Sequence, residues 1–207
     1  MKIGIDIDGV VIDSETTFRT YEEIFAIEEL NGRKIVNSEE PKFQQRYDWT
    51  EEEQKQFIDK YFLEVSKNSG LMSGFVPVYK RLKEQGHEFV VITARGGFVD
   101  EMKDDAERVL NENGIVFDKY YWKNDDKVHA CLDEKVDLMI DDDHRIVKRL
   151  NDNGIKTLYF RDTNLLRLPE TELNHEVNNW GDIYRYINEN CWRGEINESN
   201  ISIRITT

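Results

Sequence analysis

The stretch KIGIDIDGV, residues 2–10, joins a short strand pattern to two acids and a glycine. Residues 2–7 alternate and are rich in β-forming side chains, which predicts a strand. Asp6 and Asp8 are two residues apart, and side chains of an extended chain repeat with a period of two, so both carboxylates point the same way. Gly9 then allows the backbone to turn tightly, close to a phosphate. We therefore expect a strand that ends in a pair of carboxylates.

Strand and helix patterns alternate along most of the remaining chain. Further strands are predicted at residues 88–93, 117–122, 136–140 and 156–160. Helices are predicted at residues 77–85, 98–113, 127–134, 143–153 and 181–190. Gly86, Gly114 and Gly154 follow three of these helices and suit left-handed C-caps. Such alternation predicts an α/β protein with a parallel sheet covered by helices on both faces.

Residues 14–75 break this rhythm. They carry helical patterns at about 15–30 and 51–67 and contain no parallel-strand pattern. We therefore expect a small helical cap inserted after the first strand, over the sheet edge where α/β proteins bind ligands. The predicted core is residues 1–13 and 76–190, and residues 191–207 form a C-terminal tail without a clear pattern.

The composition limits the partners of this 207-residue chain. Its formal net charge of -14 repels phosphate backbones and argues against a nucleic-acid polymer, but not against a small phosphorylated substrate bound with a cation. Two cysteines, Cys131 and Cys191, give no disulfide framework. There is no signal-peptide pattern and no apolar run long enough to span a membrane. We expect a cytoplasmic protein.

Polar residues gather where the predicted strands end. Asp6 and Asp8 follow the first strand, and Thr93 ends the second. The run 141–143, Asp-Asp-Asp, follows the fourth strand, and Lys127 opens the helix before it. Because the carboxyl ends of parallel strands share one edge, these groups can converge.

This set of groups suits phosphate chemistry. A carboxylate that attacks a phosphate ester meets charge repulsion, which a bridging magnesium ion offsets. A lysine and a hydroxyl stabilise the transferring group, and a second carboxyl can protonate the leaving oxygen and then activate water. An aspartyl-phosphate divides the hydrolysis into two easier steps.

Each feature also has an ordinary explanation. Asp-x-Asp-Gly occurs in many turns, although Val10 and Val11 rule out an EF-hand loop here. Asp143 is better explained as a helix N-cap. Thr93 alone fits any strand, and Lys127 alone fits a solvated surface. The ordered combination is the specific signal.

The series DIDGV, VITAR, Lys127 and IDDD resembles the four motifs of the haloacid dehalogenase superfamily of phosphatases. The helical insertion, the second motif and the late helix VNNWGDIYRYI, residues 177–187, resemble its 5'(3')-deoxyribonucleotidase-type branch. The resemblance implies a Rossmann-like three-layer α/β fold with a parallel sheet, and a Mg²⁺-dependent phosphomonoester hydrolase.

The resemblance also implies roles for individual residues. Asp6 is the nucleophile and a metal ligand, and Asp8 is the general acid/base and ligates magnesium through its backbone carbonyl. Asp141 ligates the metal directly, and Asp142 supports it through water or from the outer sphere. The phosphate is held by the side chains and backbone of Thr93, Ala94 and Lys127. Lys123 competes with Lys127 for the lysine role.

The substrate stays open between several classes. The leading hypothesis is a nucleoside monophosphate, with another small metabolite, such as a sugar phosphate or phosphoglycolate, as the alternative. A catalytically weak nucleotide sensor is a third reading. Arg95 reaches the substrate or forms a surface salt bridge. Four cap aromatics either stack on a base or form the cap's own core: Phe18, Phe43, Tyr47 and Trp49.

Overall fold

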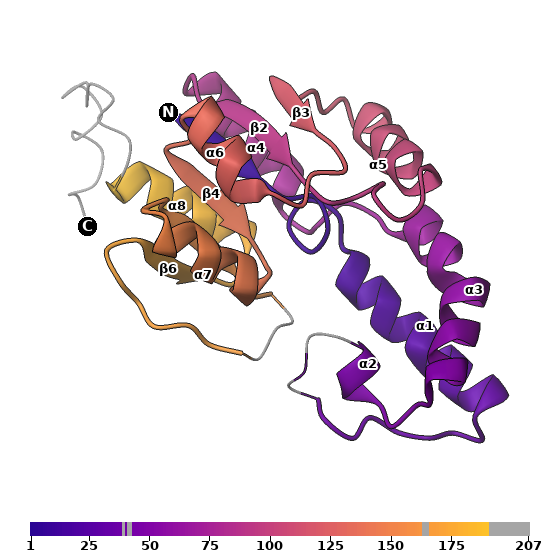
Figure 1. Cartoon of the computed structure of the whole chain (residues 1–207). Helices are drawn as coiled ribbons and strands as arrows, with labels where there is room; N and C mark the ends of the chain where they lie inside the picture. The colour runs from indigo at the N-terminus through magenta and orange to yellow at the C-terminus, as the bar shows by residue number, and fades with distance from the viewer. Residues whose placement is uncertain (39, 41–42, 163–165, 191–207) are drawn as a thin grey trace, which may run out of the picture.

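In a computed structural model, which describes residues 1–38, 40, 43–162 and 166–190, the protein is built on a six-stranded parallel sheet (Figure 1). Its strand order is β3-β2-β1-β4-β5-β6. The strands are β1 (Lys2–Ile5), β2 (Glu88–Ile92), β3 (Lys119–Tyr121), β4 (Leu138–Asp141), β5 (Thr157–Phe160) and β6 (Asn174–Val177). The predictions for residues 191–207 and Cys191 lie outside the described residues.

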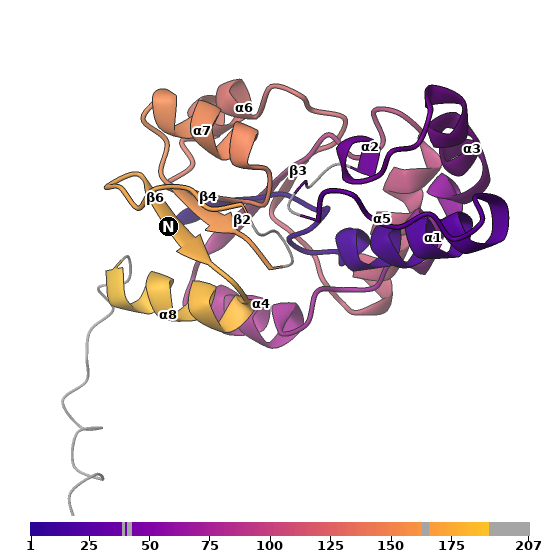
Figure 2. The ribbon, with the colours of Figure 1, turned by 90° about the horizontal axis from the view of Figure 1, so that it is seen from below.

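Helices cover both faces of this sheet, as Figure 2 shows. On one face, α4 (Phe75–Glu84), α5 (Glu101–Glu112) and α8 (Trp180–Asn190) join a core cluster with Ile3 and Ile5 of β1. On the other, α6 (Lys127–Glu134) and α7 (His144–Asp152) pack with alternate strand residues such as Val90 and Met139. The expected three-layer, Rossmann-like α/β fold is therefore confirmed.

The elements predicted for the core all appear, with ends that shift by a few residues. The strand β6 was missed because its sequence, NHEV, is short, polar and placed at a sheet edge. The predicted left-handed C-caps are correct, since Gly86, Gly114 and Gly154 have φ values of 81°, 66° and 76°.

The insertion after β1 contains α1 (Ser14–Glu29), α2 (Phe43–Arg46) and α3 (Glu51–Asn68), which we call the cap. The helix α3 begins at a capping box, in which Thr50 accepts from the Glu53 backbone N–H and Glu53 accepts from that of Thr50. The cap has an aromatic core cluster of its own, centred on Phe25 and Phe57. The predicted helices were found, but the four-residue α2 was not foreseen.

The two connections between cap and sheet run side by side. The Asp13 backbone N–H donates to the Gly70 carbonyl at 2.9 Å, and that of Met72 donates to the Val11 carbonyl at 2.8 Å. Ile12 and Leu71 form an antiparallel bridge between them. The cap thus leaves and rejoins the sheet at one place, beyond the carboxyl end of β1.

Candidate active site

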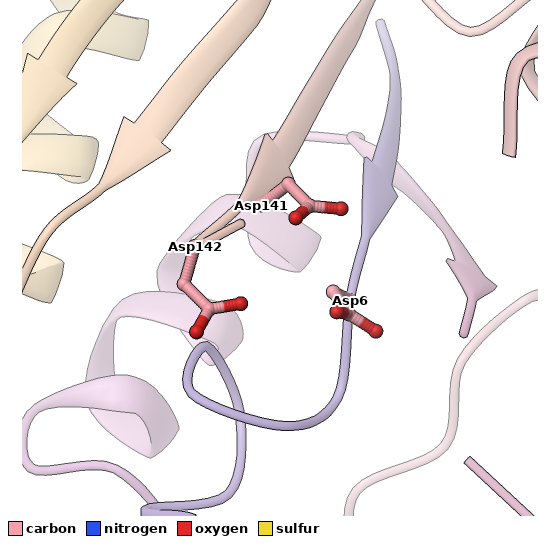
Figure 3. A group of neighbouring side chains, drawn as sticks. All are labelled: Asp6, Asp141 and Asp142. Carbon is pink, nitrogen blue, oxygen red and sulfur yellow. The ribbon is translucent and has the colours of Figure 1, made fainter. Parts of the chain in front are cut away.

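Three aspartates converge beyond the carboxyl ends of β1 and β4. Ile5 of β1 is in register with Ile140 of β4, so Asp6 and Asp141 come next to each other at the sheet edge. Figure 3 shows the Asp141 carboxylate turned toward the strand that carries Asp6, and Asp142 beside the loop that follows β1. One carboxylate oxygen from each residue lies within 4.8 Å of those of the other two.

Backbone amides and one lysine fix this cluster. The Ile7 N–H donates to Asp6 Oδ1 at 2.7 Å, and the Asp143 N–H donates to Asp141 Oδ1 at 2.9 Å. Lys127, only 4% exposed, places Nζ 2.7 Å from Asp6 Oδ2 and 2.7 Å from Asp141 Oδ2. Burial alone would lower the pKa of Lys127, but the two carboxylates outweigh burial and raise it.

The lysine that meets the aspartates is thus Lys127, at the first turn of α6, where Asp126 caps the helix. Lys123 lies in the preceding turn with a half-exposed side chain and pairs with Asp100. Asp143 caps α7, where its side chain accepts a hydrogen bond from the Arg145 backbone N–H, as its N-cap interpretation predicted.

The cluster carries more negative charge than Lys127 alone balances. Burial raises the pKa of Asp141 to about 6 against the opposing charge of Lys127. Burial and the neighbouring charges of Asp141 and Asp6 raise the pKa of Asp142 well above its usual value. Three closely spaced carboxylates with one ammonium fit a hard divalent cation, which takes oxygen ligands. The residues present therefore suit Mg²⁺, with Asp6, Asp141 and Asp142 as the side chains that would hold it.

Asp8 points to a different partner. Its Oδ1 forms a short salt bridge with Arg95 Nη1, and its carboxylate is not part of the three-aspartate group. Burial raises the pKa of Asp8, while Arg95 and a hydrogen bond from Ser14 oppose this shift. Arg95 is buried, so the expected surface salt bridge is wrong, and Arg95 is not among the described residues that line the cavity; its contact with substrate stays a prediction.

The second predicted motif lies under the same edge. Thr93 is buried, and its Oγ1 accepts from the Arg95 backbone N–H at 3.2 Å. Ala94, the next residue, lines the cavity above the aspartates, whereas Thr93 is not among the described residues that do so.

A cavity of about 540 Å³ lies between this edge and the cap. Its walls include Asp6, Asp8, Lys127 and Asp142 from the core and Phe18 from the cap. The other three predicted stacking residues, Phe43, Tyr47 and Trp49, are 8%, 3% and 5% exposed and belong to the cap's aromatic core. For these three the base-stacking interpretation is wrong, because the cap uses them for its own stability.

Several cavity residues were missed by sequence reasoning. From the cap come Glu15, Arg19 and Phe62, and from the core Asn124 and Arg161. Arg161 directly follows β5, so the strand-end rule that selected the aspartates would also have selected it. The cap residues carry no comparable signal, because their inward position depends on how α1 and α3 pack.

No protein-family model matches the sequence, and a comparison with curated proteins found no match. In the described part of the chain, the helices are all too short or too polar to cross a membrane.

Solved structures nevertheless share the fold. A haloacid dehalogenase-like hydrolase from Streptococcus pneumoniae matches with a TM-score of 0.63 and 13% identity over 90% of this chain and 97% of its own. A predicted phosphoglycolate phosphatase from Haemophilus somnus matches with a TM-score of 0.60 and 16% identity, over 88% of this chain and 96% of its own. A putative beta-phosphoglucomutase from Thermotoga maritima matches with a TM-score of 0.57 and 13% identity, over 91% of this chain and 98% of its own. The protein therefore has the haloacid dehalogenase-like α/β fold.

Proposed function

We propose that this protein is a Mg²⁺-dependent phosphomonoester hydrolase that works through an aspartyl-phosphate on Asp6. One observation carries the proposal: Asp6, Asp141, Asp142 and Lys127 meet at one sheet edge, and Asp6, Asp142 and Lys127 also line the cavity between this edge and the cap. The shared fold of hydrolases and phosphatases supports the same reaction class.

In the first step an Asp6 oxygen attacks phosphorus, and the ester P–O bond breaks. Asp8 gives its proton to the leaving oxygen, which departs as an alcohol. Arg95 has only donors, so the Asp8 oxygen that faces it carries no proton, and the transferable proton belongs to the other oxygen. Lys127 lies close enough to Asp6 to hold the transferred phosphate as negative charge develops.

In the second step the Asp8 carboxylate takes a proton from water as that water attacks phosphorus. The bond between phosphorus and the Asp6 oxygen breaks and inorganic phosphate leaves. Asp6 is again a carboxylate, and Asp8 is again protonated. When bound, Mg²⁺ would offset the repulsion between the carboxylates and the phosphate.

For the substrate we propose a small phosphomonoester that fits the cap-covered cavity. Phe18 and Phe62, with ring centroids 5.7 Å apart, give the cavity an aromatic wall, which keeps a nucleoside monophosphate as a candidate. Structural neighbours described as a phosphoglycolate phosphatase and a phosphoglucomutase favour a smaller phosphorylated metabolite. A panel of nucleoside monophosphates, sugar phosphates and phosphoglycolate, assayed for phosphate release with Mg²⁺, separates the two.

The variant Asp6→Asn tests the reaction. It removes the attacking oxygen's charge, so we expect hydrolysis of p-nitrophenyl phosphate with Mg²⁺ to fall to background. Asp137→Asn is the matched control, because Asp137 lies before β4, at the opposite end of the sheet, and pairs with the Lys2 backbone N–H. Hydrolysis that survives Asp6→Asn would refute the nucleophile. Nucleotide binding without turnover by the wild-type protein would favour a sensor instead.

A further inference from the structure

Arg95 is a buried arginine with every guanidinium nitrogen engaged. It is 4% exposed, and its Nε donates to the Met102 carbonyl at 2.7 Å. Its Nη1 pairs with Asp8 Oδ1, and its Nη2 donates to Ser66 Oγ at 2.8 Å. These partners come from the loop after β1, the start of α5 and the cap helix α3. One side chain thus joins the candidate acid/base to two helices, α3 and α5.

Ser66 holds the other end of this connection. Its hydroxyl accepts from Arg95 and donates to Asp105 Oδ2 of α5 at 3.0 Å, and the residue is 2% exposed. The guanidinium fork is planar and rigid, so two fixed partners set its orientation. The Arg95 plane, and with it the place of the Asp8 carboxylate, is therefore determined jointly by α3 and α5.

We propose that Arg95 is a positioning residue for proton transfer by Asp8, and that Ser66 makes this positioning depend on the seating of the cap. The inference rests on the proposed acid/base role of Asp8. Transfer of a proton needs hydrogen-bond reach to the leaving oxygen, and a misplacement of about 1 Å can cost about 100-fold in rate.

The competing explanation is that Arg95 only fastens the cap to the core. The chain contains another contact of that kind: Arg108 of α5 donates from Nη2 to the Lys67 carbonyl of α3 at 3.0 Å. Arg108 also forms ion pairs with Asp105 and Glu112, within α5. Arg108→Met therefore removes a link between α3 and α5 and one ion pair of Asp105, but leaves the contacts of Arg95 with Ser66 and with Asp8 in place, and serves as the matched control.

The test compares two aryl phosphates that differ in their need for protonation. Nitrophenolate leaves p-nitrophenyl phosphate readily without a proton, whereas phenyl phosphate depends on the acid. We expect Arg95→Met to lower kcat/KM with Mg²⁺ about 100-fold for phenyl phosphate and about tenfold or less for p-nitrophenyl phosphate, since general acid catalysis contributes about 10²–10⁴-fold. Arg95→Lys, which keeps the charge but not the fork, should show the same preference to a smaller extent.

Ser66→Ala tests the link to the cap and disturbs the core least. We expect it to lower kcat/KM for phenyl phosphate about threefold to tenfold more than for p-nitrophenyl phosphate, within the size of one lost hydrogen bond to a charged group. Combined with Arg95→Met it should add no further selectivity, because both changes act on the same chain of contacts. Arg108→Met should leave the ratio of the two substrates unchanged.

If Arg95→Lys and Ser66→Ala lowered kcat/KM equally for both substrates, the inference would be overturned. It would also be overturned if Arg108→Met changed the ratio of the two kcat/KM values as much as Ser66→Ala does. A raised KM with unchanged kcat would show that Arg95 contacts substrate instead. These outcomes leave the proposed function intact. Failure of the wild-type protein to cleave either ester, or activity that survives Asp6→Asn, would overturn the proposed function and this inference together.

Discussion

At the scale of single residues, Gly9 lies where the chain approaches Asp142 most closely. Its φ is 71°, and a Cβ atom built there would lie 2.2 Å from Asp142 Oδ2. Any side chain would therefore push a carboxylate out of the three-aspartate group. Glycine at this position is required both by the left-handed backbone and by the neighbouring side chain.

Gly9→Ala should unfold more easily than Gly32→Ala and should lose activity. Gly32 has a φ of 74°, but no atom lies within 4 Å of a Cβ built there. Gly32→Ala should therefore lose only the about 1–2 kcal/mol that a left-handed backbone costs a residue with a side chain, a cost that Gly9→Ala also has. Urea unfolding and hydrolysis of p-nitrophenyl phosphate measure the difference. Equal stability and full activity in the two variants would show that Asp142 can move aside freely.

Sequence reasoning was strongest for residues that directly follow strands. Asp6 and Asp141 could be brought together in advance, because a parallel sheet fixes which strand ends meet, and Lys127 could be added because it opens the helix that leads into β4. The direction of a long side chain could not be predicted in the same way. Arg95 turns inward because Asp8 and Ser66 offer it hydrogen-bond partners. The position of Trp49 was left open between ligand stacking and the cap's own core for a similar reason, since an aromatic ring in a helical cap can face either a ligand or its neighbours; it lies in the cap's core.

At the scale of elements, the turn between α4 and β2 contains an unusual histidine. His87 is 2% exposed, and neither ring nitrogen has a hydrogen-bond partner among the described residues. Burial, with a smaller contribution from the N-terminal amine, lowers the pKa of His87 below its usual value. Folding therefore disfavours the protonated form of this ring.

The free energy of unfolding should decrease as the pH falls below the pKa of an ordinary histidine, about 6.5. Below this value the unfolded chain binds a proton that folded His87 resists, so its contribution is present above about pH 6.5 and is lost as the pH falls, by at most about 1.4 kcal/mol per pH unit. Urea unfolding at pH 7.5 and 5.5 measures the loss. His87→Leu should reduce the difference between the free energies of unfolding measured at the two pH values. If this difference is unchanged in the variant, other groups cause the pH dependence.

Element prediction failed where the pattern is short or polar. The strand β6 pairs with β5 along its full length, yet only Asn174 and Val177 are buried in it. Its place in the sheet comes from the preceding strand and not from its own sequence. The core strands were predictable because both faces are covered, which demands a continuous apolar run.

At the scale of the whole molecule, a net charge of -14 makes the folded chain sensitive to all cations. Ordinary salt at 0.1 M largely screens the repulsion between surface charges that lie more than about 10 Å apart. The group formed by Asp6, Asp141 and Asp142 should respond differently, because its three carboxylates come together only in the folded state and a cation held by them would stabilise that state.

Mg²⁺ should therefore raise the melting temperature more than NaCl of equal ionic strength. At 100 times its Kd it would add about 2.7 kcal/mol, or roughly 5–10 °C for a chain of this length. Asp141→Asn should abolish the excess over NaCl, as measured by thermal unfolding. An equal shift with both salts in the wild-type protein would contradict a specific ion site.

The paired connections of the cap, where Asp13 meets Gly70 and Val11 meets Met72, have a consequence for how such proteins diversify. Since both crossings lie side by side, the intervening residues form a cassette whose ends are already joined. A different insert could be joined at these two crossings without changing the strand order, provided that it offers Arg95 a partner in place of Ser66. Under the proposed function, the sheet would then carry the chemistry and the exchangeable insert the selectivity.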